Sequence, residues 1–145
     1  MKTELSKRTF IGETIETRVS LSKAQISEFA TLCGDFNPLH HDQDFAARSR
    51  FGGIIASGPH TVALFMSMVA THFSQKGPML GLEFSFNFRS ATRIDKVLLM
   101  SWRVTKIKYK DSLKGNLVWL VGSITDSEGE EIISSSGKIL LTNEL

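Results

Sequence analysis

The sequence predicts an α+β domain in which an antiparallel sheet curls around one long helix. Four runs of alternating apolar and polar residues, the pattern of half-buried strands, occupy residues 80–89, 97–109, 117–125 and 132–142. Before them, a helical segment that begins at residue 58 is apolar on almost every side. A sheet of this size has to fold over that helix in order to bury it.

The N-terminal part of the chain predicts one further strand and one helix. Residues 11–21 alternate apolar and polar side chains, as a half-buried strand does. Ser22 and Gln25 then form a capping box, and Gly34 is suited to end the helix that it starts. The apolar stripe of this helix should face a core, with its cysteine as a buried residue; it consists of Ile26, Phe29, Ala30 and Cys33.

A long connection separates this helix from the next. Residues 35–56 lack periodicity apart from one turn of helix expected near 44–48, and such connections in small domains are usually functional. Gly58 and Pro59 then open the second helix, because proline is tolerated at a first helical position. From residue 63 to 70 it is apolar on every side except at Ser67, so we expect protein all around it.

The later strands have distinct details. The first holds the stripe Leu80, Leu82, Phe84, Phe86 and Phe88. In the second, the apolar phase changes near Thr105, which predicts a β-bulge. The last two strands are joined by the turn residues 126–129. A curled sheet around one helix is the hot-dog arrangement, and its open outer strand predicts a homodimer or a multiple of dimers.

Composition excludes several classes of protein. The chain has 145 residues, which we take as one domain over 1–145, and its formal charge of +2 provides no basic face for nucleic acid. No apolar run approaches the roughly 20 residues that a membrane helix needs. The single cysteine rules out an internal disulfide framework. Without a secretory pattern at residues 1–16, the cytoplasm is the expected location.

The connection and the start of the second helix carry a recognisable pattern, Gly34-Asp35-Phe36-Asn37-Pro38-Leu39-His40, followed by Phe51-Gly52-Gly53 and Ser57-Gly58. Over residues 26–70 this segment resembles the MaoC-like family, the (R)-specific enoyl-CoA hydratases and dehydratases of hot-dog fold. The resemblance implies that Asp35 and His40 are the catalytic pair and that the Gly58 N–H contacts the thioester oxygen. It implies interconversion of trans-2-enoyl and (R)-3-hydroxyacyl thioesters. It also implies no metal and no cofactor beyond the coenzyme A or acyl carrier protein of the substrate.

The residue types suit that chemistry. Adding water to a conjugated double bond needs a base, an acid, and a donor for the oxygen that gains charge. Asp35 and His40 can supply the first two, and Asn37-Pro38 between them favours a bend that aims both at one water. Gly58 can supply the donor, since an N–H at a helix start has no partner within the helix.

Other residues near the motif are candidates for substrate contact. Asn37, Ser57 and His60 flank the expected site, although many hydratases have His and a large apolar residue where this chain has Ser57 and Pro59. His60, with Ser67 and Thr71, makes a narrow polar stripe that faces either the substrate or neighbouring backbone. We expect His41 to be solvated, and no third cluster of ligands accompanies His40-His41-Asp42 to form a metal site.

Basic residues and rival functions remain open at this point. Phosphates of coenzyme A are possible partners of two basic groups, which otherwise are solvated surface: Arg48, Arg50, Arg89 and Arg93, and Lys106, Lys108 and Lys110. One rival function is an acyl-CoA thioesterase of hot-dog fold, against which the GD-x-NP-x-H motif argues. A second is a non-catalytic acyl-binding or partner-binding subunit, against which the intact Asp35 and His40 argue.

Overall fold

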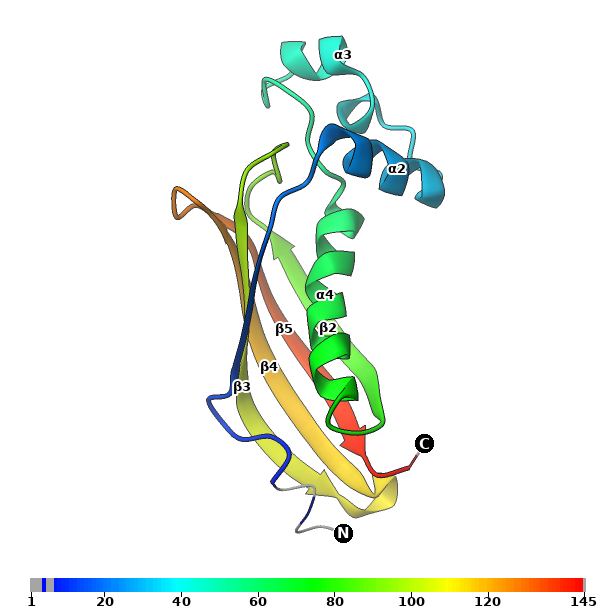
Figure 1. Cartoon of the computed structure of the whole chain (residues 1–145), viewed down its shortest axis with the longest axis vertical. Coiled ribbons are helices and arrows are strands. Elements are labelled where there is room, and N and C mark those ends of the chain that lie inside the picture. The colour runs from blue at the N-terminus through cyan, green and yellow to red at the C-terminus, as the bar shows by residue number, and fades with distance from the viewer. Residues whose placement is uncertain (1–3, 5–6, 145) are drawn as a thin grey trace.

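One antiparallel sheet forms the body of the protein (Figure 1). The computed structural model describes Glu4 and residues 7–144. Within them the strands are β1 (Thr14–Val19), β2 (Met79–Phe88), β3 (Leu98–Lys110), β4 (Gly115–Asp126) and β5 (Glu131–Thr142). Their order across the sheet is β1-β3-β4-β5-β2, so that β1 and β2 are the two edge strands.

The long helix α4 (Gly58–Ser74) lies along the strands against one face of the curved sheet, which confirms the predicted α+β architecture (Figure 1). Phe65, Val69 and Phe73 on its inner face are fully buried. The indole of Trp102 on β3 stacks on Phe65 at 4.3 Å between ring centroids and donates its N–H to the Phe65 carbonyl at 2.9 Å. The helix is thereby fixed to the centre of the sheet.

The opposite face of α4 departs from expectation. Met66 is half-buried and Ala70 and Thr71 are exposed, so a single chain does not surround the helix. The sheet covers one side, and no other element of the described chain covers the far side fully. The all-round apolar pattern is therefore only partly used within one chain.

The helices α2 (Lys23–Cys33) and α3 (Gln43–Arg48) cap the end of the sheet at which α4 begins (Figure 1). The predicted capping box of Ser22 and Gln25 is present, and Gly34 ends α2 with a left-handed φ of 73°. Ile26 is buried in a second small core, but Cys33 is exposed, which makes the prediction of a buried cysteine wrong. Cys33 is the last residue of α2 and lies beyond the part that packs on that core.

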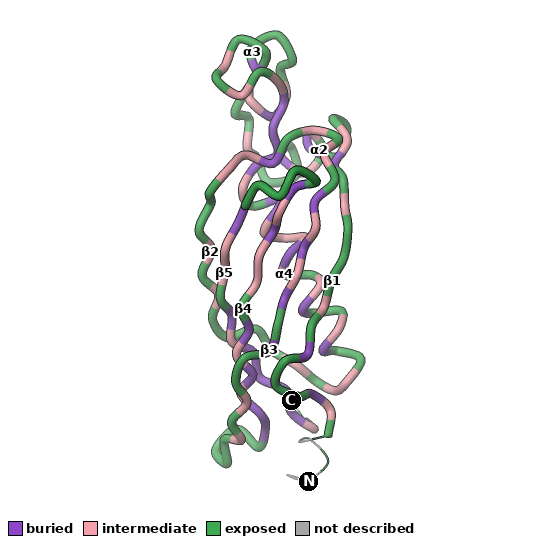
Figure 2. Tube along the Cα trace, turned by 90° about the vertical axis from the view of Figure 1, so that its left-hand side faces the viewer, coloured by how far each residue is buried: buried purple, intermediate pink, exposed green. Residues whose placement is uncertain are grey.

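Three strand pairings are irregular, one of them between β4 and β5 at Ile124 and Thr125. The register between β3 and β4 shifts between Val104 and Lys106, where a bulge was predicted, and an unpredicted shift lies between Gly81 and Glu83 of β2. Along the edge strand β2, Leu82 is 45% exposed and Phe88 is 58% exposed, whereas Phe84 and Phe86 pack against the core. Figure 2 shows how much of this strand is uncovered.

Within the described residues, no helix combines the length and the apolar character needed to cross a membrane.

Candidate active site

A cavity of about 440 Å³ lies where α4 begins. Four segments line it: the single turn η1 (Pro38–His40) with Asn37 before it, the chain before α4, the first turn of α4, and the end of β2 with the following loop. The lining residues are Asn37, Leu39, His40, Arg50, Phe51, Ile55, Ala56, Gly58, Pro59, Thr61, Phe88, Arg89, Ser90, Ala91 and Thr92. The fold thus brings the predicted His40, Asn37 and Gly58 to one space.

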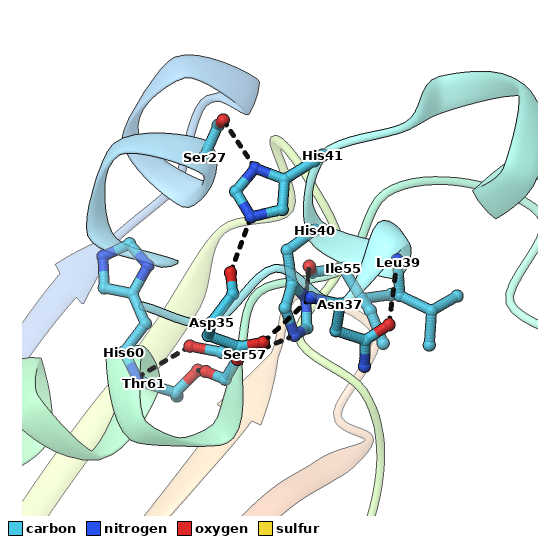
Figure 3. A network of polar contacts seen from close by, with 10 residues as sticks. All are labelled: Ser27, Asp35, Asn37, Leu39, His40, His41, Ile55, Ser57, His60 and Thr61. Carbon is cyan, nitrogen blue, oxygen red and sulfur yellow. Dashed lines mark hydrogen bonds and ion pairs between the residues drawn. The ribbon is translucent and has the colours of Figure 1, made fainter. Parts of the chain in front are cut away.

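The imidazole of His40 has a defined orientation. The residue is only 6% exposed, and its Nδ1 lies 2.8 Å from the carbonyl oxygen of Ile55 (Figure 3). Because a carbonyl can only accept, Nδ1 carries the hydrogen, and the neutral ring leaves a lone pair on Nε2. That nitrogen faces Oδ2 of Asp35 at 3.4 Å.

Asp35 reaches this position from the end of α2. Its N–H donates to the Ala30 carbonyl at 2.8 Å, and its Oδ1 accepts the Asn37 N–H at 3.1 Å. The side chain is 35% exposed, and Asp35 does not itself line the cavity but contacts His40, which does. The 3.4 Å between Oδ2 and His40 Nε2 is longer than the roughly 2.8 Å of a charge-assisted hydrogen bond. With a neutral His40 ring, Nε2 and Oδ2 are therefore two acceptor atoms that face each other.

Asn37 shapes the turn between the two residues. Its backbone is extended, with φ −57° and ψ 121°, and its Oδ1 accepts the Leu39 N–H at 3.1 Å as the cap of η1. The His40 N–H donates to the Asn37 carbonyl at 3.0 Å. Asn37 therefore both lines the cavity and fixes the spacing from Asp35 to His40.

Gly58 opens α4 and lines the cavity. In the part of the chain that the structure describes, its N–H has no hydrogen-bond partner. Its backbone lies outside the positive-φ region, so a left-handed conformation is not the reason for a glycine here. A Cβ there would instead come within 2.9 Å of Cε1 of Phe88. A side chain at this position would have to displace the Phe88 ring, which occupies that space.

Ser57 and His60 lie behind the cavity and do not line it. The Ser57 hydroxyl is buried and accepts the His60 N–H at 3.3 Å as the cap of α4. The imidazole of His60 stacks on Phe29 of α2 at 4.3 Å between centroids. Burial lowers the pKa of His60, and among the described residues its Nδ1 finds no hydrogen-bond partner. Ser57 therefore caps α4, and His60 packs the start of α4 against α2.

The remainder of the polar stripe runs away from the cavity. Ser67 donates its hydroxyl hydrogen to the Ala63 carbonyl at 2.6 Å, and Ser67 and Thr71 line a separate groove beside β1. Of the two alternatives for the stripe, contact with neighbouring backbone therefore describes Ser67.

The basic residues divide by position. Arg50 and Arg89 line the cavity, whereas Arg48 does not and the Arg93 guanidinium donates to the Phe51 carbonyl. The three lysines of β3 are exposed and lie toward the end of the sheet opposite α2 and α3 (Figure 1): Lys106, Lys108 and Lys110. Their position matches a solvated face.

Sequence reasoning missed part of the cavity wall. Thr61 and Thr92 join their hydroxyls at 3.0 Å on the wall, and Phe51 and Phe88 supply its aromatic surface. Thr61 follows the helix opening directly, but the end of β2 could be placed there only by the tertiary fold.

His41 corrects a second expectation. It is half-buried rather than solvated, with Nε2 2.7 Å from the Asp35 carbonyl oxygen and Nδ1 2.9 Å from the Ser27 hydroxyl. Within the described residues, no group of three or more His, Cys, Asp or Glu side chains is arranged to hold a metal ion.

Curated relatives match parts of the chain. A 3-hydroxybutyryl-CoA dehydratase of Methylorubrum extorquens is 30% identical over 97 residues, which are 67% of this chain and 61% of that protein. An (R)-specific enoyl-CoA hydratase of Aeromonas caviae is 34% identical over 77 residues, 52% of this chain and 58% of that protein. The chain thus spans about three fifths of the length of these two relatives.

Solved structures share the fold over almost the whole chain. The (R)-hydratase from A. caviae involved in PHA biosynthesis superposes with a TM-score of 0.82 at 23% identity, over 94% of this chain and 98% of that chain. A MaoC-like dehydratase from Rhodospirillum rubrum gives 0.79 at 25% identity, over 97% and 98%. The MaoC-like domain matches residues 6–118. This match spans the motif, the cavity, the strands β1 to β3 and the start of β4, and the chain belongs to the MaoC-like domain family.

Proposed function

We propose that the protein adds water reversibly to trans-2-enoyl thioesters to give (R)-3-hydroxyacyl thioesters. The observation that carries this proposal is the pairing of His40 Nε2 with Asp35 Oδ2, 3.4 Å apart, beside a cavity at a helix start. The names of the two curated relatives, a dehydratase and an (R)-specific hydratase, support the reaction class and the stereochemistry.

The geometry suits one water molecule. A water can donate its two hydrogens to His40 Nε2 and Asp35 Oδ2 at once, which leaves its oxygen lone pairs free for attack. As its oxygen bonds to the β carbon, one of the two acceptors takes a proton, and the π electrons move toward the thioester oxygen. The proton then goes to the α carbon, so that the sum is one water added and both residues are restored.

The thioester oxygen needs a donor while it carries charge. The Gly58 N–H lines the cavity, is free of helical hydrogen bonds and lies at the positive end of the α4 dipole. The next residue offers no second N–H, because Pro59 carries none. We assign the developing negative charge to this donor.

One assay separates the proposed activity from its rivals. Purified protein mixed with crotonyl-CoA should remove the enoyl absorbance without releasing free thiol. Release of thiol would indicate a thioesterase, in which water attacks the carbonyl carbon, and no change would indicate a non-catalytic acyl-binding subunit. Repeating the assay with longer acyl chains, on coenzyme A and on acyl carrier protein, identifies the preferred thioester.

We also propose that two copies associate. The edge strand β2 leaves Leu80, Leu82 and Phe88 about half exposed, and the outer face of α4 is only partly covered. A second copy would bury the apolar side chains of β2 and cover the outer face of α4. Light scattering at micromolar concentration should give twice the chain mass of 16.1 kDa or a multiple of that value, and a stable monomer would contradict association.

A further inference from the structure

The ring of His41 contacts both α2 and the backbone of Asp35, beside the turn η1 that carries His40. His41 follows His40 directly and caps η1. Its Nδ1 lies 2.9 Å from the hydroxyl of Ser27 on α2, and its Nε2 lies 2.7 Å from the backbone carbonyl oxygen of Asp35 (Figure 3). Two adjacent histidines therefore meet Asp35 at different atoms, His40 at the carboxylate and His41 at the carbonyl.

The direction of these hydrogen bonds follows from the donors available. The Asp35 carbonyl can only accept, so Nε2 of His41 carries a hydrogen. In the neutral ring Nδ1 is then an acceptor, and the Ser27 hydroxyl donates to it. The Asp35 carbonyl thus fixes the tautomer of His41, and the Ser27 hydroxyl holds the ring at Nδ1.

This contact completes the support of Asp35. Its N–H is held by the Ala30 carbonyl at 2.8 Å, and its Oδ1 by the Asn37 N–H at 3.1 Å. With His41 on the carbonyl, both sides of the Asp35 backbone are tied down, while Oδ2 stays open toward His40. Since His41 touches no carboxylate oxygen of Asp35 in the described contacts, it holds the residue without competing for its reactive atom.

We propose that His41, oriented by Ser27, is a positioning residue that sets the Asp35 carboxylate against His40 Nε2. The inference rests on the proposed function, because the reaction is what this alignment serves. A displacement of about 1 Å at a reacting group can cost on the order of 10²-fold in rate, so the loss of one tether should be visible in turnover.

Two substitutions at His41 separate its nitrogens. The amide of Gln reaches approximately the place of Nε2, and that of Asn the place of Nδ1. H41N should therefore lose the contact to the Asp35 carbonyl and lower kcat by about 10- to 100-fold, with KM changed by no more than about two-fold. H41Q should keep kcat within about three-fold of the parent, and S27A should fall between these two variants.

Matched controls and a spectroscopic measurement distinguish positioning from general stability. S67A removes a serine hydroxyl whose contact stays within α4, and it should keep the parent kcat. Ring ¹⁵N spectra without substrate should show hydrogen on Nε2 of His41 in the parent and in S27A, with the Nδ1 signal shifted in S27A because that nitrogen loses its hydrogen-bond donor. The His40 ring signals should move in H41N and return in H41Q.

The outcomes decide the two proposals separately. If the parent fails to hydrate any enoyl thioester, the proposed function fails, and the ¹⁵N spectra alone then decide the positioning role. An H41N variant with parent kcat and unmoved His40 signals overturns that role, as does a parent His41 with its hydrogen on Nδ1. Loss of kcat in H41N only in proportion to the unfolded fraction overturns it as well.

Discussion

A histidine paired with a carboxylate lies near each end of α4, and the two carboxylates differ in the number of hydrogen bonds that they accept. At the C-terminal end, His72 Nε2 lies 2.8 Å from Oε1 of Glu13. Lys76 donates to the same oxygen, and the Thr9 hydroxyl donates to Oε2. At the N-terminal end, His40 faces Asp35 at 3.4 Å. The Glu13 side chain is 9% exposed, and that of Asp35 is 35% exposed.

The electrostatics of Glu13 follow from its contacts. Burial acts to raise its pKa, but hydrogen bonds from Lys76, Thr9 and His72 outweigh burial and lower the pKa to about 2. Glu13 is therefore an ionised, internally paired group that ties the segment before β1 to the end of α4. The comparison shows that Glu13 is held by three hydrogen-bond donors, whereas the contact between Asp35 and His40 is longer and more exposed, as the proposed role of that pair requires.

The largest expected effect removes the open pair. D35N and H40A should each lower hydration of crotonyl-CoA by about 10² to 10⁴-fold, the usual loss for a general acid or base. Their melting temperatures should stay near that of the parent. The double variant should be little slower than the slower single one, because the pair acts as a unit. Near-full activity in either single variant would end the proposed role of the pair.

A second change keeps the pair and alters the donor. G58V should lower turnover by on the order of 10²-fold, because its side chain denies the substrate oxygen access to the N–H. It also displaces the Phe88 ring, which is 58% exposed and can move outward. Kinetics and thermal melting on the same sample measure the two effects.

The matched control for this change is another glycine. G53A places a Cβ where nothing lies within 4 Å, at a backbone conformation open to any residue, and it should keep parent turnover. If G58V melts like the parent and hydrates at the parent rate, Gly58 is not the donor.

At the satisfied pair, the expected effect falls on stability. The pKa of Glu13 is depressed from 4.5 to about 2, so its contribution is complete above pH 4.5 and is lost as the pH falls toward 2. The parent should lose roughly 3 kcal/mol of unfolding free energy over this interval. E13Q should lack this pH dependence and be less stable at pH 7 by a similar amount. Denaturant unfolding at several pH values tests this, and turnover per folded molecule should not change.

The smallest expected effect concerns His60, which lies in the first turn of α4. Among the described residues, its buried Nδ1 has no hydrogen-bond partner. H60F keeps the stacking on Phe29 and removes this unpaired atom, so stability should stay within about 1 kcal/mol of the parent or rise. Turnover should stay within about three-fold, because His60 does not line the cavity. A loss of 100-fold without loss of stability would instead place His60 in contact with the substrate.

Local signals in the sequence were reliable because local contacts determine them. The capping box at Ser22, the left-handed Gly34 and the bulge near Thr105 each depend on residues a few positions apart, and all three are present. The turn from Asp35 to His40 is of the same kind, since Asn37 and Pro38 fix it from within.

Long-range contacts were beyond reach of the sequence pattern. His41 was expected in solvent because its partner Ser27 lies 14 residues earlier on another helix. Phe88 belonged to an alternating stripe, and nothing local predicted that the end of β2 would cover Gly58. Cys33 followed helical spacing, yet the core beneath α2 ends before it.

The origin of Phe88 has a consequence for how such a protein can diversify. The two residues proposed to transfer protons lie within a stretch of six residues, whereas the ring over Gly58 comes from the far end of an edge strand. Chemistry and substrate fit are therefore encoded in different parts of the gene. If the proposed function holds, exchanging Phe88 for a smaller or larger side chain should change which acyl groups the cavity accepts, while residues 35–40 stay unchanged. Directed evolution for new substrates can start at this one position.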